Sequence, residues 1–225
     1  YLTNRNSLRI DAFRQSIEKW KEEDLISENE YFYLVAGVVE SVPFVSNIAG
    51  TYGAYLKIWD NRSSRRIDPV KYQVENNYKE NKCYNQNVTD LIKTINGDIL
   101  YLDPPYNGRQ YISNYHLLET VARYDNPKIK GTTGIRVDPD ATSDFCKKSK
   151  VSTVFEELIR NSNFKYVVVS YSNEGIMSED EISNILKKYG NPKTLKVKKI
   201  PYRRYKRTSN VIENKLNELL FTIEK

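Results

Sequence analysis

The 225-residue sequence is poor in the side chains that most often bind metals or act as nucleophiles. It contains two cysteines, Cys83 and Cys146, and one histidine, His116. Two cysteines in a chain of this length make no disulfide framework, and their spacing is not that of zinc ligands. We therefore expect reduced thiols, no bound metal and no Cys–His nucleophile. His116 lies within a helical pattern, which is more typical of a packing or surface residue than of a catalytic base.

Long apolar runs are absent as well. No stretch approaches the ~20 apolar residues of a membrane-spanning helix, and no apolar core follows a basic start as in a signal peptide. These absences favour a cytoplasmic protein. The sequence does not begin with methionine, so we expect it to be a fragment of a longer protein.

Acidic residues are outnumbered: 35 lysines and arginines face 29 aspartates and glutamates, which gives a net charge of +6 and a pI near 9.0. This balance suits a polyanionic partner without identifying it. Residues 187–207 hold ten basic residues and no acidic one. The basic residues between 57 and 71 fit either a solvated linker or a segment laid on a phosphate backbone. They are Lys57, Arg62, Arg65, Arg66 and Lys71.

Hydrophobic periodicity divides the chain into two regions. Apolar residues recur at helical spacing over residues 10–20 and 31–42. Residues 75–82 have the polar composition of a linker. We predict a helical region over residues 1–78 and an α/β region over residues 79–225.

Within the α/β region, apolar strand patterns alternate with amphipathic helix patterns. This alternation is typical of βαβ units with a parallel sheet. The last two strands lack a convincing crossover helix, which predicts an antiparallel hairpin. Residues 126–150 lack periodicity and are predicted to form a long loop. The expected strands span residues 98–102, 166–171, 194–201 and 219–223, and the expected helices span 113–124, 151–160 and 178–189.

One short stretch carries most of the chemistry. An apolar run ending at Leu102 is typical of a buried strand. Pro104 and Pro105 cannot continue a hydrogen-bonded ladder, so the chain must leave the sheet as a stiff, extended turn. Asp103 and Tyr106 are thereby held at the carboxyl end of a strand, where open α/β sheets place their ligands. Residues 103–106 are called the Asp-Pro-Pro-Tyr turn below.

Such a turn suits an amine as the group to be modified. The exocyclic amine of a nucleobase is a poor nucleophile because its lone pair is delocalised into the ring. The Asp103 carboxylate and the Pro104 carbonyl can orient the amine and polarise its N–H bonds, and proline aims its carbonyl rigidly because its φ is fixed. Tyr106 offers an aromatic face on which an extruded base can stack. An electrophilic methyl group held in line would complete the reaction mainly by positioning.

The sequence resembles the DNA adenine-N6 methyltransferases of the Dam-like class, particularly restriction–modification methylases. The resemblance implies a partial Rossmann-like sheet of the S-adenosylmethionine-dependent type, preceded by a helical target-recognition region. It is carried by residues 46–55 (with Ala-Gly-Thr-Tyr-Gly), 97–107 (with Asp-Pro-Pro-Tyr), 109–120 and 170–175.

The resemblance further implies S-adenosylmethionine as methyl donor, and N6 of adenine in a specific double-stranded DNA sequence as acceptor. It implies flipping of the target base, a bacterial host and a paired restriction endonuclease system. The catalytic residues it implies are Asp103, Pro104, Pro105 and Tyr106. The implied cofactor-binding residues are Asn87, Val88 and Asp103, although Asn87 stands where the family commonly has an aspartate.

DNA contacts are expected from three parts of the chain. These are the glycine-containing loop near residue 50 with the basic residues after it, the loop after the Asp-Pro-Pro-Tyr turn, and the basic run near residue 200. The candidate DNA-binding residues are Asn47, Thr51, Tyr52, Lys57, Arg62, Arg65, Arg66, Arg109, Arg203 and Arg204.

One family feature is missing. The family carries a Phe-x-Gly-x-Gly signature on its first strand and an acidic residue on the second, and neither occurs here. The segment from Gly50 to Gly53 has the wrong spacing and no strand before it. We therefore expect a truncated form with weak or no methyl transfer of its own, unless another chain supplies the missing part.

Two other functions stay open at this stage. The chain could be a non-catalytic DNA-binding module derived from a methylase, which the two basic runs also fit. It could also be an amine methyltransferase that acts on cytosine N4, RNA or a protein amide. The leading aspartate of the turn favours adenine by resemblance alone.

Overall fold

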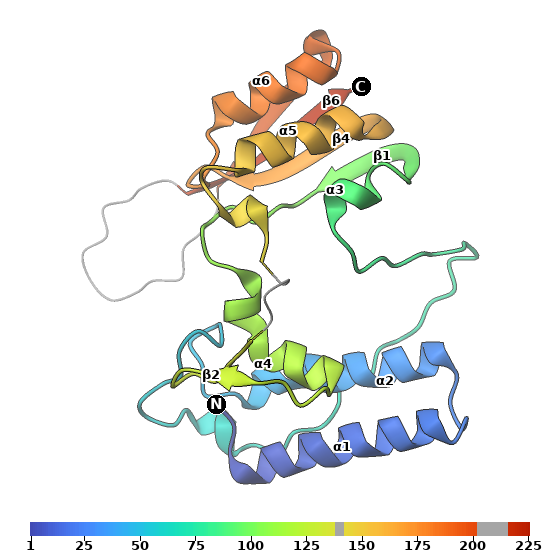
Figure 1. Ribbon diagram of the computed structural model, residues 1–225, viewed down its shortest axis with the longest axis vertical. Helices are drawn as coiled ribbons and strands as arrows, with labels where there is room; N and C mark the ends of the chain where they lie inside the picture. Colours follow the sequence, from blue (N-terminus) through green and yellow to red (C-terminus); the bar gives the residue numbers. More distant parts are fainter. Residues whose placement is uncertain (138–141, 202–215) are drawn as a thin grey trace. The chain divides into compact units, whose positions relative to one another are not determined.

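The computed structural model describes residues 1–137, 142–201 and 216–225 (Figure 1). The chain forms two compact units, each with its own hydrophobic core. Unit 1 comprises residues 1–80 and 110–142, and unit 2 comprises residues 81–109 and 143–225.

This division corrects the expected ranges of 1–78 and 79–225. The boundary near residue 80 agrees, but residues 110–142 return to the helical unit. The reason is the apolar face of α4 (Tyr111–Arg123), since Leu117 and Val121 pack in the core of unit 1. A helix buries its apolar stripe wherever a complementary surface exists, and its place in the sequence does not show where that is.

Three helices build most of unit 1. Local sequence explains their ends: the Thr3 side chain caps α1, and Ser27 with Glu30 forms a capping box at the start of α2. The core gathers side chains from all three helices, such as Ile17, Val38 and Val121. The helices are α1 (Asn4–Glu22), α2 (Glu28–Ser41) and α4 (Tyr111–Arg123), each longer than its periodic core suggested.

The rest of unit 1 consists of short elements. α2 ends at Ser41, and Pro43 lies in the 3-10 turn that follows. The segment expected to be one long loop, residues 126–150, contains a small antiparallel pair within unit 1 and a 3-10 turn within unit 2. The short elements of unit 1 are η1 (Val42–Val45), η2 (Asn61–Ser64), β2 (Ile129–Lys130) and β3 (Ile135–Arg136), and the 3-10 turn in unit 2 is η3 (Asp144–Cys146).

Unit 2 is built on a four-stranded mixed sheet in the order β1-β4-β6-β5. β1 and β4 are parallel, with Leu102 opposite Val169, as the strand–helix alternation predicted. The predicted antiparallel hairpin of the last two strands is confirmed, and β6 is also antiparallel to β4. The strands are β1 (Asn96–Leu102), β4 (Asn163–Ser172), β5 (Lys196–Pro201) and β6 (Asn217–Glu224).

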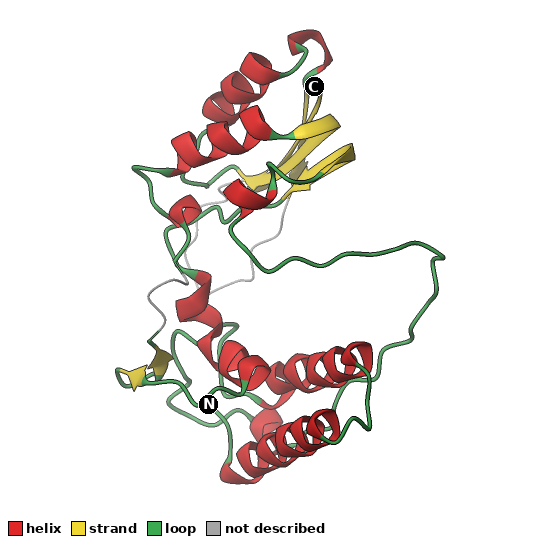
Figure 2. Cartoon of the chain, turned by 45° about the vertical axis from the view of Figure 1, so that its right-hand side comes forward, coloured by secondary structure: helices red, strands yellow, loops and turns green. Residues whose placement is uncertain are grey.

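Helices pack on one face of this sheet (Figure 2). Alternate residues of β4, such as Val167 and Val169, are buried against them, as the period of a strand requires. Ser178 and Glu181 form a capping box at the start of α6, where the sequence predicted a helix to begin. The helices are α3 (Val88–Leu91), α5 (Val151–Asn161), α6 (Glu179–Tyr189) and the 3-10 turn η4 (Pro192–Thr194).

The structure also bears on membrane spans, metal ligands and the cysteines. Within the described residues, no helix is long and apolar enough to cross a membrane. The described residues also contain no cluster of His, Cys, Asp and Glu suited to a metal ion. Both cysteines are free thiols.

Candidate functional site

The Asp-Pro-Pro-Tyr turn lies at the carboxyl end of β1, as expected. Leu100 and Leu102 are buried in the core of unit 2, and the chain leaves the sheet directly after Leu102. Asp103 is exposed and Tyr106 retains 43% of its accessible surface. The turn therefore presents a carboxylate and an aromatic ring to solvent from a strand that cannot shift without disturbing the core.

The segment after β4 holds this turn in place. The backbone N–H of Ile176 donates to the carbonyl oxygen of Tyr106 at 2.9 Å. A Cβ on Gly175 would lie 2.1 Å from Cε1 of Tyr171, so only glycine lets the backbone cross that buried ring. The N–H of Met177 donates to the Tyr171 hydroxyl, and burial raises the pKa of this hydroxyl. Residues 172–177 thus form a tight turn that braces the Asp-Pro-Pro-Tyr turn.

Arg109 belongs to the same unit and follows the turn closely. Its N–H donates to Oδ1 of Asn107 at 3.0 Å, and its carbonyl accepts a hydrogen bond from Sγ of Cys146. Burial raises the pKa of the Cys146 thiol, so the sulfur stays protonated and acts as a donor. Backbone contacts therefore anchor the loop while the Arg109 residue is exposed.

Asn87 and Val88 begin α3, the short helix that precedes β1. Oδ1 of Asn87 accepts the N–H of Thr89 at 3.0 Å and so caps the helix. Val88 packs against the core of unit 2. Both residues thus have a structural role at the start of α3, whatever they bind.

Two of the candidate DNA contacts lie inside unit 1. Asn47 is only 3% exposed, and its amide joins two points of the following segment: Nδ2 donates to the Leu56 carbonyl at 2.8 Å, and Oδ1 accepts the Asp60 N–H at 3.0 Å. Tyr52 is 1% exposed and its hydroxyl pairs with Ser46 Oγ at 3.0 Å. Burial raises the pKa of the Tyr52 hydroxyl. Both side chains were expected to contact DNA directly, and their burial does not fit that expectation.

Tyr52 also ties its loop to α4 within unit 1. Its N–H donates to the carbonyl of Asn114 at 2.7 Å, and its own carbonyl bonds Nε2 of His116 at 2.9 Å. His116 is 2% exposed. The structure therefore makes His116 a packing residue, in line with its position in a helical pattern.

The basic candidates differ in how far they are already engaged. Arg62 donates to the Ile48 carbonyl and pairs with Asp60, so it helps to fold its own loop. Arg66 pairs with Asp68 at 3.2 Å. Three other candidates are exposed or half-exposed: Lys57, Arg65 and Thr51. Arg203 and Arg204 lie outside the described residues.

Sequence reasoning missed two residues beside Lys57. Ile58 is 84% exposed and Trp59 is 54% exposed, although both are large and apolar. The signal available in the sequence was an apolar pair inside a basic, polar segment without helix or strand periodicity.

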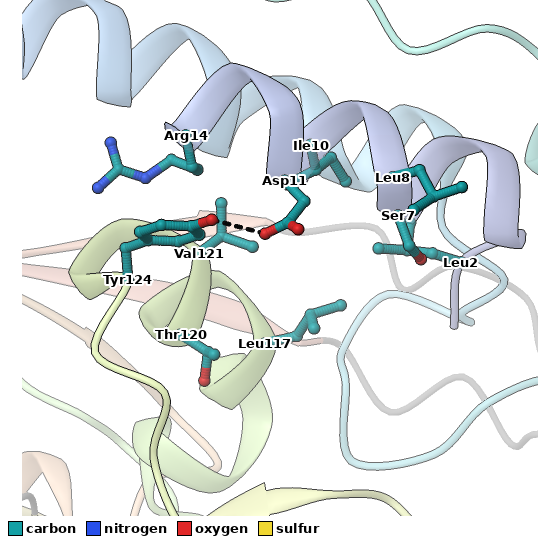
Figure 3. Close-up of a pocket in the computed structure, with 10 residues that line it drawn as sticks. All are labelled: Leu2, Ser7, Leu8, Ile10, Asp11, Arg14, Leu117, Thr120, Val121 and Tyr124. Atoms are coloured by element: carbon teal, nitrogen blue, oxygen red, sulfur yellow. Dashed lines mark hydrogen bonds between the residues drawn. The ribbon is translucent and has the colours of Figure 1, made fainter. Parts of the chain in front are cut away.

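Unit 1 also contains a pocket of about 320 Å³ between α1 and α4 (Figure 3). Its polar groups serve packing: Asp11 accepts the Tyr124 hydroxyl at 2.7 Å, and Arg14 stacks on the Tyr124 ring and pairs with Glu18 at 2.5 Å. The pocket belongs to unit 1, whereas the Asp-Pro-Pro-Tyr turn belongs to unit 2. We assign it no part in catalysis.

Comparison with known proteins identifies the family. The model of the D12 class N6 adenine-specific DNA methyltransferases matches residues 1–185. The type II methyltransferase M.FokI of Planomicrobium okeanokoites is 49% identical over the whole chain, and the modification methylase StsI of Streptococcus sanguinis is 44% identical. The chain spans about a third of each of these relatives (35% and 34%). The type II methyltransferase M.NlaIII of Neisseria lactamica is 38% identical over the whole chain, which spans 65% of it.

No solved structure matches the chain. The family model covers the helices of unit 1, the Asp-Pro-Pro-Tyr turn and the bracing segment after β4. The α/β class expected from the sequence is confirmed, and so is the resemblance on which the family expectation rested. The chain belongs to the D12 class N6 adenine-specific DNA methyltransferase family.

Proposed function

We propose that this protein transfers a methyl group from S-adenosylmethionine to N6 of adenine in double-stranded DNA, within a restriction–modification system. The observation that carries the proposal is the Asp-Pro-Pro-Tyr turn itself. It is held at the carboxyl end of a buried strand by the Ile176–Tyr106 hydrogen bond, in a chain of the D12 family.

The turn supplies the acceptor side of the reaction. The exposed Asp103 carboxylate and the Pro104 carbonyl accept hydrogen bonds from the adenine amine, which orients its lone pair toward the methyl group. The half-exposed ring of Tyr106 stacks on the base once it has left the duplex. Pro105 keeps the backbone extended between these groups.

The chain also has residues suited to part of the methyl donor. S-adenosylmethionine, when bound, supplies an electrophilic methyl group. Asn87 is exposed and its amide oxygen already accepts Thr89, so its Nδ2 is the group it offers to a purine ring. We propose that Asn87 and Val88 lie beside the donor's adenine and that Asp103 also lies against the donor. The sequence contains no pair of glycines one residue apart, so the chain offers no glycine-rich strand end for the rest of the donor.

DNA binding is proposed for the exposed basic residues. Within the described residues, Lys57, Arg65 and Arg109 form no ion pair of the kind that engages Arg62 and Arg66, which leaves their charges available to phosphates. We propose that the buried Asn47 and Tyr52 shape the recognition loop instead of contacting DNA. Thr51, Arg62 and Arg66 remain candidate contacts from the same loop, and Arg203 and Arg204 from the basic run near residue 200.

The test is methyl transfer by the protein as its gene encodes it, with Asp103→Ala as the variant. Unmethylated phage and plasmid DNA serve as substrates, since mass spectrometry of digested nucleosides needs no known recognition sequence. We expect N6-methyladenine from the unmodified protein and a loss of at least about a hundredfold in Asp103→Ala, because a preorganised polar group at the reacting centre is removed. DNA affinity should change less than twofold.

Asp98→Ala is the matched control, because Asp98 is an exposed aspartate on the same strand. Asp103→Ala activity within fivefold of the unmodified protein would contradict the proposed role of the turn. Detection of N4-methylcytosine as the product would show that the acceptor is cytosine N4 and not adenine N6. DNA binding without any methylated product would favour a non-catalytic DNA-binding module.

A further inference from the structure

Residues Lys57, Ile58 and Trp59 form a basic and apolar tip on unit 1, called the tip below. Ile58 and Trp59 are 84% and 54% exposed, and Lys57 is exposed. Single exposed apolar residues are common on proteins, but two large ones adjacent in sequence on an irregular segment expose much apolar surface to water.

The tip is held by a polar clip at its base. The single amide of Asn47 bonds the carbonyl of Leu56, just before the tip, and the N–H of Asp60, just after it. The N–H of Leu56 donates back to the Asn47 carbonyl at 3.1 Å, and Ile48 forms an isolated bridge with Tyr55. Both ends of the tripeptide are therefore fixed by one buried residue.

A second layer of contacts supports the clip. Arg62 donates to the Ile48 carbonyl, and its N–H donates to Oδ1 of Asp60 at 2.9 Å. The ends of the tip are thus ordered before any partner binds, which lowers the entropic cost of binding. The fold uses the buried Asn47 amide and the half-buried Arg62 to present two apolar side chains to solvent, and core packing does not explain this arrangement.

We propose that Ile58 and Trp59 act as an apolar wedge that enters the DNA base stack, with the Trp59 indole stacked on a base. This inference rests on the proposed DNA-methylating function and adds DNA-deforming residues to it. The charge of the segment favours DNA as the partner. Lys57 directly precedes the apolar pair, Asp60 after it is paired with Arg62, and the exposed Arg65 follows in the same segment of a protein of net charge +6.

An apolar wedge would stabilise the DNA conformation that base flipping requires. Extrusion of a base breaks its stacking, and apolar side chains inserted between base steps are a common way to stabilise the unstacked duplex. An indole recovers stacking on any base, because every base has an aromatic face. The tip therefore needs no particular sequence for this part of its action.

The experiment compares binding of the 225-residue chain to two duplexes that differ by one abasic site. At an abasic site the base is already missing, so a side chain can enter the stack there without displacing a base. A wedge should therefore bind the abasic duplex more tightly. We expect the unmodified chain to bind the abasic duplex more tightly than the intact one, and Trp59→Ala to lose about tenfold in affinity for the abasic duplex. Ile58→Ala should reduce the preference for the abasic duplex. Lys57→Ala should keep that preference but reduce the slope of log affinity against log salt concentration by about one, because one phosphate contact is lost.

Trp20 supplies the matched control. It is the other of the two tryptophans, belongs to unit 1 and is 41% exposed on α1. Trp20→Phe should leave DNA binding unchanged and makes Trp59 the sole tryptophan. The fluorescence of Trp59 in that variant should be quenched by saturating DNA, as stacking on a base requires.

Two outcomes would overturn the wedge alone. One is unchanged Trp59 fluorescence at saturating DNA; the other is a Trp59→Ala variant that binds with full affinity and keeps its full preference for the abasic duplex. Weaker self-association of Trp59→Ala with intact DNA binding would also overturn it, since the tip would then be a protein interface. Absence of DNA binding by the unmodified chain would instead overturn the DNA-directed function on which the wedge rests.

Discussion

Unit 1 and unit 2 keep their shapes by different kinds of contact. In unit 1 buried polar side chains join segments far apart in sequence: Asn6 bonds the carbonyls of Ser63 and Arg65 and the N–H of Ile67. In unit 2 the core consists almost wholly of apolar residues between a sheet and its helices. Side-chain hydrogen bonds can hold irregular loops in one conformation, whereas a packed sheet holds a strand end.

This contrast matches the two proposed tasks. A DNA-recognition surface needs loops of individual shape, and the clipped tip of unit 1 is one. A methyl-transfer site needs a carboxylate, a carbonyl and a ring held in fixed geometry, and the carboxyl end of β1 provides this. Three experiments, from the largest expected effect to the smallest, test whether the two units behave as differently as their contacts suggest.

The largest effect is expected from Gly175→Ala in unit 2. The new Cβ would lie 2.1 Å from a ring carbon of Tyr171, which is only 1% exposed and cannot move aside. Overpacking of this kind costs roughly 1–3 kcal/mol. Hydrogen exchange should rise in peptides of unit 2 and remain unchanged in unit 1, and methyl transfer should fall.

Gly108→Ala is the control, because its Cβ would have its nearest contact at an ordinary 3.6 Å, from the Cys146 carbonyl. Equal protection of unit 2 in Gly175→Ala and in the unmodified chain would show that the bracing segment is not rigid. Faster exchange in both units would show that they unfold together, which would break the comparison.

A smaller effect is expected in unit 1 on acidification. Nη2 of Arg136 is 2.5 Å from Asp125, and this guanidinium holds the pKa of the Asp125 carboxyl below its usual range. A carboxyl whose pKa is lower in the folded state stabilises the fold above its unfolded pKa, about 3.9, and this contribution is lost as the pH falls through the folded value. Protection of unit 1 should therefore decrease below about pH 4.

Asp125→Asn isolates this pair. It should destabilise unit 1 by roughly 1.5 kcal/mol at pH 7, because the buried Arg136 loses a charged hydrogen-bond partner that is itself partly solvated. Its stability should then depend less on pH between 4 and 2 than that of the unmodified chain. Urea titrations followed by hydrogen exchange in each unit measure both effects. An equal acid dependence in the variant would assign the loss to other carboxylates.

The smallest effect is expected from Tyr52→Phe. The substitution removes the hydroxyl that pairs with Ser46 Oγ but keeps the ring in the core. One neutral hydrogen bond is worth about 1 kcal/mol. We expect unit 1 to lose that much stability and to keep its DNA affinity within twofold, as a shaping residue should. A tenfold loss of affinity with normal stability would instead make Tyr52 a direct contact.

Short-range patterns in the sequence predicted much of this structure. Helix periodicity located α1, α2, α4, α5 and α6, and the helix expected over residues 178–189 begins at Glu179 after the cap residue Ser178. Two prolines after Leu102 predicted that the chain leaves the sheet at the Asp-Pro-Pro-Tyr turn. These features depend on neighbours within a few residues, so the sequence contains them directly.

Tertiary structure alone decided which candidate residues reach the surface. Asn47 is buried where its amide bonds Leu56 and Asp60 of the following segment, and Tyr52 is buried where its backbone meets Asn114 of α4, which is remote in the chain. The same contacts leave Ile58 and Trp59 in solvent, although both are apolar.

The place of residues 110–142 in unit 1 was likewise beyond sequence reasoning. The apolar stripe of α4 specifies that it is buried but not against which helices. Local propensity and turn chemistry thus determined the elements and the Asp-Pro-Pro-Tyr turn. Burial depends on which parts of the chain come together in the fold, so only the folded units could separate the buried residues that hold the segment from Asn47 to Arg66 from those that are exposed on it.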